Sequence, residues 1–432
     1  MSPSPVSRRG YSRARLIAWI GVLIVVCLLG VYTIRWNSRL THGFAMYYTY
    51  SSMLLHGDDL TRVFDYQHFN IIIRQYGIAG VVDMPNNPPT VSLAMFALAV
   101  FPPAVAKTIW SICSLVLLGI SIIVLLKVFS IDSRRIAYPF LVGLCFLWRP
   151  VYENIAFGQM YILLLFLFAL ALYGMKSRSF VTTALAVSIS VVLKGYGILV
   201  MLWFGFHRMK KTLLLAGIAI ALIFLLTTPV FTPKVWQRYW EQGIPNLLDS
   251  PSNAHVAYQT IAGFIDHMFH YEAQWSPHPL ISLPQWFSTI ITLLAVVLVI
   301  AGVLVEGRIE HNDPRLLLSF CAAVAVGVVT SPVAEEYHYT LFLPLVVGLS
   351  ATFLEEFQKT RRLGLKEALF IPSILLLAAP LRYKLLQGVG FPFIFLAYPK
   401  LYAGLAILWC YRLAAIPRRT FRPANNAVRE SH

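Results

Sequence analysis

The chain has 432 residues and a formal net charge of +16, and 58% of its residues are hydrophobic against 12% charged. This composition leaves too little polar surface for a water-soluble globular protein, so we expect an integral membrane protein. The basic excess would suggest nucleic acid in a soluble protein, but here Lys and Arg gather in short loops and at both termini, which marks membrane topology and attraction to anionic lipids.

The N-terminal segment 1–15 is basic and contains Arg8, Arg9, Arg13 and Arg15. The uncharged run 16–34 that follows is long enough to cross a bilayer and lacks a small-residue cleavage site before Arg35. We therefore predict an uncleaved signal anchor with a cytoplasmic N-terminus.

Further hydrophobic runs, bounded by charged residues or proline-containing turns, predict one domain, 16–411, with about twelve transmembrane helices. The segment 88–101 is short and bounded by prolines, so we expect it to enter the membrane only in part. A turn at Lys194-Gly195-Tyr196-Gly197 divides 180–206 into two short helices. The other predicted spans are 108–126, 136–148, 157–175, 212–228, 285–305, 316–332, 339–354, 368–381 and 391–411.

Short loops rich in Lys and Arg are predicted to be cytoplasmic. They lie around Lys176 and Arg178 and at 207–211, 307–315 and 359–366, and a basic tail follows at 412–432. By alternation, two long loops, 35–87 and 229–284, lie outside, and we expect them to carry short amphipathic helices. The sequence thus predicts an all-α, multi-pass protein of the cell membrane.

The five cysteines all lie in apolar runs, which indicates small hydrophobic residues rather than metal ligands or disulfide partners; they are Cys27, Cys113, Cys145, Cys321 and Cys410. No zinc-type His and Cys spacing, Ser-His-Asp order, P-loop or Gly-rich nucleotide motif occurs. We expect neither a metal nor a cofactor, and no nucleic-acid partner.

The two outer loops hold most of the aromatic, carboxylate and His residues outside the apolar runs. A secondary transporter is expected to carry ionisable residues at mid-membrane and interrupted helices in two related halves, but no matching halves and few such residues occur. An active site at the outer face fits better. A transporter or flippase of lipid-linked sugars and a non-catalytic scaffold remain the alternatives.

A series of motifs runs from about residue 40 to 345; each is weak alone, but their order and spacing are specific. They are Gly43-Phe44-Ala45-Met46-Tyr47-Tyr48, Leu54-Leu55-His56-Gly57-Asp58-Asp59-Leu60, Asn86-Asn87-Pro88-Pro89, Trp110, Phe157-Gly158-Gln159, Lys194, Gln259-Thr260-Ile261-Ala262-Gly263 and Ser331-Pro332-Val333-Ala334-Glu335-Glu336-Tyr337-His338-Tyr339. Together they resemble glycosyltransferase family 87, whose members are polyprenol-phosphate-sugar-dependent enzymes of the GT-C fold.

The resemblance implies a hexosyltransferase that moves a sugar, with mannose favoured, from a polyprenyl-phosphate donor to a glycolipid or glycan acceptor. It places the active site on the outer face of a bacterial inner membrane, in contact with membrane lipids. The lipid-linked donor is a substrate, and the chemistry needs no metal. A base deprotonates the acceptor hydroxyl, while cationic groups hold the leaving phosphate.

The expected catalytic base is missing from its usual position. Family members generally carry an Asp just before the Phe that aligns with Phe44, and this chain has Gly43 there. Candidate replacements lie in the same outer loop: Asp58, Asp59, Asp65 and His42. A solvated turn after Gly57 is the alternative interpretation of Asp58-Asp59, whereas an imidazole such as His42 titrates near neutral pH.

Two cations are candidates for binding the donor phosphate. Lys194 ends an apolar run beside Gly195, where it is placed to meet a phosphate, although an interfacial Lys also reaches lipid headgroups. Arg149 faces the same side, and its alternative role is a structural ion pair with Glu153.

Five further polar residues are candidates for contact with donor sugar or acceptor: Glu335, Glu336, His338, Gln159 and Gln259. The two acids also suit the N-terminal dipole of a helix that begins near Tyr339. Gln159 alternatively packs at a helix start.

Overall fold

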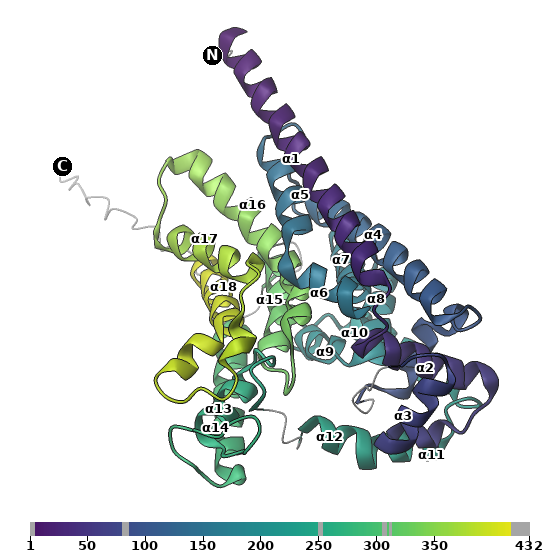
Figure 1. Cartoon of the computed structure of the whole chain (residues 1–432). Coiled ribbons are helices and arrows are strands. Elements are labelled where there is room, and N and C mark those ends of the chain that lie inside the picture. Colours follow the sequence, from purple (N-terminus) through teal and green to yellow (C-terminus); the bar gives the residue numbers. More distant parts are fainter. Residues whose placement is uncertain (1–4, 80–85, 249–253, 305–308, 311–312, 416–432) are drawn as a thin grey trace, which may run out of the picture.

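The computed structural model describes residues 5–79, 86–248, 254–304, 309–310 and 313–415, which form helices and loops and contain no β-strand (Figure 1). The predicted all-α architecture is confirmed for these residues. The predicted cytoplasmic tail from residue 416 onward and part of the loop 307–315 lie outside them. All five cysteines are free.

α1 (Pro5–Asn37) is one continuous helix along the side of the bundle, packed against α5 (Ala137–Leu147) and α6 (Arg149–Phe157) (Figure 1). Its apolar side chains are largely exposed, for example Leu16 at 61% and Val31 at 65%. In water such a surface would cost free energy, whereas lipid chains cover it at no such cost. This matches the predicted span at 16–34.

Among the described residues, five helices are long and apolar enough to cross a bilayer: Ser12–Asn37, Pro103–Val128, Lys210–Thr227, Gln285–Leu304 and Glu336–Thr360. Shorter apolar helices lie at Ala137–Leu147, Tyr161–Lys176, Phe180–Lys194, Gly197–Phe206 and Arg315–Val329. A hydrocarbon core of about 30 Å needs about 20 residues of helix. The described helices are therefore compatible with a polytopic membrane protein, and the count of about twelve spans stays a prediction.

The bundle combines helices from both halves of the chain. α7 packs against α4 and α8, and α8 against α10. α15 contacts α9, α14, α16 and α18, and α17 packs along α18. The bounds are α4 (Pro103–Val128), α7 (Tyr161–Lys176), α8 (Phe180–Lys194), α9 (Gly197–Phe206), α10 (Lys210–Thr227), α14 (Gln285–Leu304), α15 (Arg315–Val329), α16 (Leu343–Thr360), α17 (Leu365–Ala378) and α18 (Pro399–Ala415).

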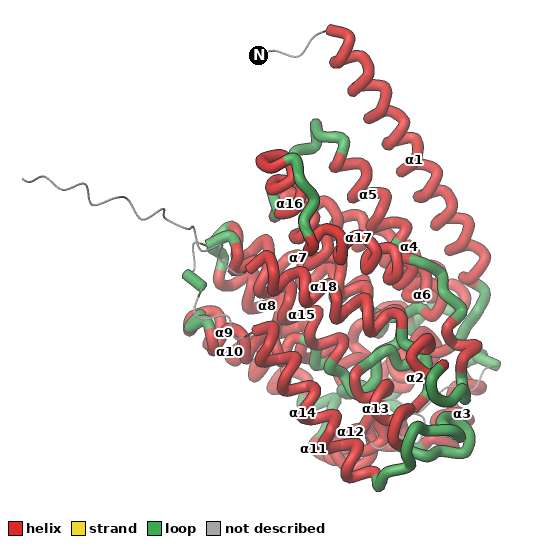
Figure 2. Tube along the Cα trace, turned by 90° about the vertical axis from the view of Figure 1, so that its left-hand side faces the viewer, coloured by secondary structure: helices red, strands yellow, loops and turns green. Residues whose placement is uncertain are grey.

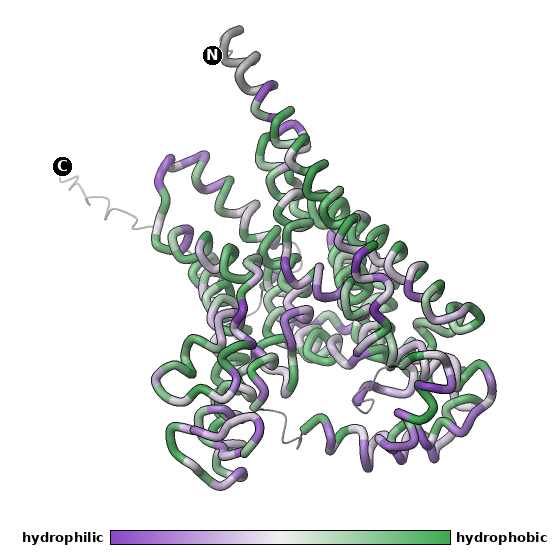
Figure 3. The backbone as a smooth tube through the Cα atoms, in the orientation of Figure 1, coloured by the Kyte–Doolittle hydropathy of each residue, from purple (hydrophilic) through white to green (hydrophobic). Residues whose placement is uncertain are grey.

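A layer of short helices from both predicted outer loops covers one end of the bundle, the lower end in Figures 1 and 2. Hydrophilic residues gather in this layer, while the bundle is mainly hydrophobic (Figure 3). The layer comprises α2 (His42–His56), η1 (Leu60–Phe64), α3 (Tyr66–Gln75), α11 (Pro233–Arg238), the π-helical turn η4 (Tyr239–Gly243), α12 (Ile244–Leu248) and α13 (Ile261–Phe269). The segment 88–101 forms η2 (Pro89–Ala94) and η3 (Phe96–Leu98), both too short to cross a bilayer, as expected.

Two predicted helices begin later than their hydrophobic runs. The run 391–411 starts with η8 (Phe393–Ala397), and α18 begins only at Pro399. The run 339–354 starts within η6 (Glu336–Phe342), and α16 follows with Pro344 in its first turn. Because proline lacks a backbone N–H, it suits the first turn of a helix and not the interior. Hydropathy alone did not show where 3-10 helix changes to α-helix in these two segments, although 339–354 lies within the helical span Glu336–Thr360.

Candidate active site

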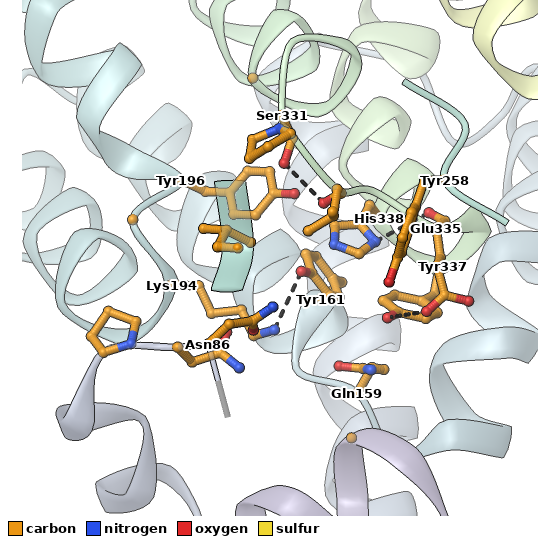
Figure 4. Close-up of a pocket in the computed structure, with 18 of the residues that line it drawn as sticks. Asn86, Gln159, Tyr161, Lys194, Tyr196, Tyr258, Ser331, Glu335, Tyr337 and His338 are labelled. Atoms are coloured by element: carbon orange, nitrogen blue, oxygen red, sulfur yellow. Dashed lines mark hydrogen bonds between the residues drawn. The ribbon is translucent and has the colours of Figure 1, made fainter. Parts of the chain in front are cut away.

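A cavity of about 980 Å³ lies where the bundle meets the layer of short helices. Its walls come from α2, the start of α7, the turn between α8 and α9, the loop before η6, and the η4–α12 segment (Figure 4). Its polar lining residues are His42, Asn86, Asn87, Gln159, Lys194, Asn246, Thr330, Ser331, Glu335 and His338, and its tyrosines are Tyr47, Tyr66, Tyr161, Tyr196, Tyr239, Tyr258 and Tyr337.

Lys194 is the last residue of α8, and the left-handed Gly195 (φ 72°) ends the helix there. Glycine adopts this conformation without strain, so the turn expected between two short helices is present, and it holds Lys194 at the cavity wall. Its Nζ donates to the Tyr161 hydroxyl at 3.3 Å (Figure 4) and lies 5.1 Å from the Tyr47 ring centroid. Lys194 is the only Lys or Arg among the described residues that line the cavity.

His338 is buried among aromatic rings, with the Tyr161 ring centroid 4.1 Å and the Tyr337 centroid 4.6 Å from its own. Its Nδ1 lies 3.1 Å from the carbonyl oxygen of Glu335. Because a carbonyl only accepts, Nδ1 must carry the hydrogen, and the neutral ring then has its lone pair on Nε2. The imidazole is thus held as an acceptor at the cavity.

Glu335 is the only carboxylate among the described lining residues. The Tyr337 hydroxyl donates to its Oε1 at 2.8 Å (Figure 4), and Lys384 Nζ lies 3.6 Å from its Oε2. Lys384 belongs to η7 (Tyr383–Leu386), in the loop before α18. Tyr337 of η6 and Lys384 of η7 therefore orient the Glu335 carboxylate at the cavity.

Gln159 occupies the space beside Gly43, the position at which the resemblance leads us to expect a carboxylate. A Cβ atom on Gly43 would lie 2.5 Å from Gln159 Cδ, so a side chain there requires the amide to move. The Tyr47 hydroxyl donates to Gln159 Oε1 at 2.8 Å. The cavity thus has a hydrogen-bonding amide at this place. His42, on the other side of Gly43, also lines the cavity.

Of the acids in the first outer loop, Asp58, Asp59 and Asp65 lie in the described part of the chain, and none of the three lines the cavity. Asp59 caps η1, accepting from the Thr61 backbone N–H at 3.0 Å and from its hydroxyl, which lowers the pKa of Asp59. Asp65 caps α3 through the His68 N–H at 3.0 Å, and Asp58 accepts from the Tyr76 hydroxyl at 2.6 Å. Their side chains serve as caps and hydrogen-bond acceptors within the outer layer.

Three other candidates also lie outside the cavity lining. Arg149 forms an ion pair with Glu153 on α6, the alternative role already considered. Glu336 pairs with buried Lys400 at 2.9 Å. Gln259 is fully buried, and its amide donates to the carbonyls of Val256 and Ala397 at 2.7 and 2.8 Å.

Asn154 of α6 was not predicted, yet it joins α6 to two elements that carry cavity residues, η6 and α7. Its Nδ2 donates to the Tyr337 carbonyl at 2.8 Å and the Thr340 hydroxyl at 2.7 Å, while its Oδ1 accepts from the Tyr161 N–H at 3.1 Å. The sign of Asn154 in the sequence was its position as a polar residue between two apolar runs. Its partners in η6, 183 and 186 positions away, were not visible in the sequence.

The aromatic lining was also missed, because Tyr161, Tyr196 and Tyr337 adjoin apolar runs and resemble a membrane-interface belt. No group of three or more His, Cys, Asp or Glu side chains that suits a metal ion occurs in the described part of the chain.

Comparison with protein-family models matches residues 86–332, more than half of the chain, to glycosyltransferase family 87. No curated protein and no solved structure gives a match. The matched region contains Gln159, Lys194 and Ser331 of the cavity and ends just before Glu335 and His338. The family predicted from the motifs is confirmed: the chain belongs to glycosyltransferase family 87.

Proposed function

We propose that this membrane glycosyltransferase transfers a hexose, with mannose favoured, from a polyprenyl-phosphate donor to a hydroxyl of a glycolipid or glycan on the outer face of the cell membrane. The observation that carries the proposal is that Lys194 and His338 face the same cavity at the end of the apolar bundle. Lys194 supplies a cation for the donor phosphate, and His338 supplies a base for the acceptor hydroxyl.

The charge of the cavity supports a lipid monophosphate donor. A sugar joined to a polyprenyl chain through one phosphate carries a single negative charge, which one lysine balances. A pyrophosphate-linked or nucleotide-linked donor carries at least two. Beside Lys194 the wall is apolar, with Ile198, Leu199 and Ile300 from α9 and α14. These side chains suit the prenyl units next to the phosphate.

In the proposed reaction the acceptor hydroxyl gives its proton to His338 Nε2. At the same time the acceptor oxygen forms a bond to the anomeric carbon of the donor sugar, from the face opposite the phosphate. The bond between that carbon and the phosphate oxygen breaks with inversion, and the electron pair leaves on polyprenyl phosphate beside Lys194. The proton on His338 is later released to water. General-base catalysis of this kind contributes about 10²–10⁴-fold.

Glu335 and Gln159 are proposed to orient the sugars. Glu335 accepts hydrogen bonds from sugar hydroxyls, while the Gln159 amide nitrogen, whose oxygen is engaged by Tyr47, donates to a hydroxyl oxygen. Tyrosine rings around them offer faces for stacking on a pyranose.

Purified protein in liposomes, incubated with radiolabelled polyprenyl-phosphate mannose and bacterial membrane lipid extract, tests the proposal. We expect labelled lipid or glycan from the wild type and a loss of about 10²–10⁴-fold in turnover for His338→Gln. His207→Gln is the matched control, because His207 is also buried and packed on an aromatic ring, 4.5 Å from the Trp203 centroid, but lies at the far end of α9. Movement of intact donor across the bilayer without transfer would support the transporter alternative and contradict the proposal.

A further inference from the structure

A second cavity, of about 770 Å³, lies at the other end of the bundle from the active-site cavity. The C-terminal ends of α4, α7, α16 and α18 and the start of α15 surround it. Its volume is in the range of small-molecule sites, about 300–1,000 Å³. The proposed glycosyl transfer makes no use of this cavity.

Cations outnumber acids in the lining of the second cavity. Arg135, Lys176, Arg178 and Arg315 face Asp132, Asp313 and Glu355. The acids are already engaged: Asp313 pairs with Arg315 at 2.6 Å, Glu355 pairs with Lys359 at 2.7 Å, and Asp132 accepts from the Arg134 backbone N–H at 2.9 Å.

Two of the cations have only neutral hydrogen-bond partners. Arg135 Nη1 donates to the Gln358 amide oxygen at 2.6 Å, and Lys176 Nζ donates to the Lys127 carbonyl and Ser130 hydroxyl, both at 2.8 Å. Within the described residues, no carboxylate lies within 4.0 Å of either charged group. The Lys176 ammonium offsets the negative end of the α4 dipole. The Arg135 guanidinium has five N–H donors, and one of them meets the Gln358 amide oxygen.

Much of the remaining wall is apolar and includes Phe129, Met175, Leu317 and Leu354. A free phosphate gains nothing from such a surface, whereas a lipid gains contact for its glycerol and upper acyl carbons. Basic pockets between transmembrane helices at the Lys- and Arg-rich end of a protein bind anionic headgroups. We propose that this cavity binds the phosphodiester headgroup of an anionic phospholipid, with Arg135 contacting the phosphate and Lys176 adding positive charge.

Native mass spectrometry of the full-length protein in detergent, titrated with phosphatidylglycerol or phosphatidylcholine, tests this proposal. We expect the wild type to retain phosphatidylglycerol preferentially and Arg135→Gln/Lys176→Gln to lose that preference by about tenfold or more, as for a lost charge-assisted contact. Both side chains belong to exposed residues, so the variant should fold. Lys210→Gln/Lys211→Gln, at the same end but outside the cavity lining, is the matched control and should retain the preference.

Equal retention of both lipids by the wild type, or an unchanged preference in the double variant, would overturn the proposal. A third arm adds millimolar inorganic phosphate before the lipid. Displacement of phosphatidylglycerol by phosphate alone would identify a free anion as the ligand and also overturn the lipid assignment. Arg135→Gln alone is the reserve variant should the double variant unfold.

Discussion

At the scale of single residues, three lysines near the active site differ in what their ammonium groups contact. Lys107 and Lys400 are fully buried and donate to carbonyls at the C-terminal ends of helices, Lys107 to Ile155 and Ala156 of α6, and Lys400 to Leu376 and Leu377 of α17. Such contacts satisfy orphan carbonyls and offset the negative end of the helix dipole. Lys194 instead faces the cavity, where its charge is available to a ligand.

Replacing Lys194 by Ala is expected to weaken donor use more than folding. A charge-assisted hydrogen bond to one phosphate oxygen contributes about 1.5–3 kcal/mol, which corresponds to about tenfold to a hundredfold in affinity. The Michaelis constant for donor, measured at saturating acceptor, should rise by that factor. Lys211→Ala, with an exposed lysine on α10, is the matched control and should leave it unchanged. A Lys194→Ala enzyme with wild-type kinetics would remove the phosphate role.

The sequence predicted some of the residues that line the cavity, but it also suggested residues that lie elsewhere. His42, Gln159, Lys194, Glu335 and His338 do lie around one cavity. Asp58, Asp59 and Asp65 do not, because an Asp after a turn looks the same in sequence whether it caps a helix or reaches a substrate. The Arg149 pairing with Glu153 also follows from their i, i+4 spacing. Only the folded chain decides between such alternatives.

At the scale of elements, hydropathy placed most helices but not every irregular segment that shapes the site. The turn after Lys194 was predictable, because glycine commonly ends a helix. The loop before η6, which carries Ser331 and Glu335 to the cavity, follows a path set by tertiary packing and has no periodic pattern in the sequence. α13 shows the same limit. A short outer helix was expected, but its attachment to Tyr398, the residue between η8 and α18, was not predictable; the Tyr398 hydroxyl donates to the Gly263 carbonyl at 2.8 Å.

The attachment of α13 is expected to weaken in acid. Burial lowers the pKa of His267 to about 4 from an ordinary value of 6.5, so the folded protein favours the neutral ring. The stability that comes from burying a neutral His267 ring is therefore fully present above pH 6.5 and is lost as the pH falls from 6.5 towards 4. Hydrogen exchange of α13 amides, corrected for intrinsic rates, should therefore show faster opening at pH 5 than at pH 7.

His267→Gln removes the titrating group and should make the opening of α13 independent of pH over this range. His56→Gln, which changes an exposed histidine of the same outer layer, should retain the wild-type dependence. If the His267 variant opens in acid as the wild type does, another group controls this element.

At the scale of the whole molecule, the two cavities lie at opposite ends of one apolar bundle, and the active-site cavity adjoins the layer of short helices. That layer forms the lower end of the molecule in Figures 1 and 3. The basic loops around Lys176, Lys210 and Lys359 lie away from that layer, at the other end. A polyprenyl-phosphate donor used on the outer face requires this layer to be outside and the basic loops to be cytoplasmic.

Cysteine labelling in intact cells tests that orientation. In a background with the five native cysteines changed to alanine, Gln67→Cys on α3 and Gln237→Cys on α11 should react with a membrane-impermeant maleimide. Thr360→Cys, at the end of α16, should react only after the cells are opened. All three positions are exposed, so a difference in labelling reports sidedness and not burial. The reverse pattern would place the active-site cavity in the cytoplasm, and the outer-face donor and acceptor would have to be abandoned while membership of the family would stand.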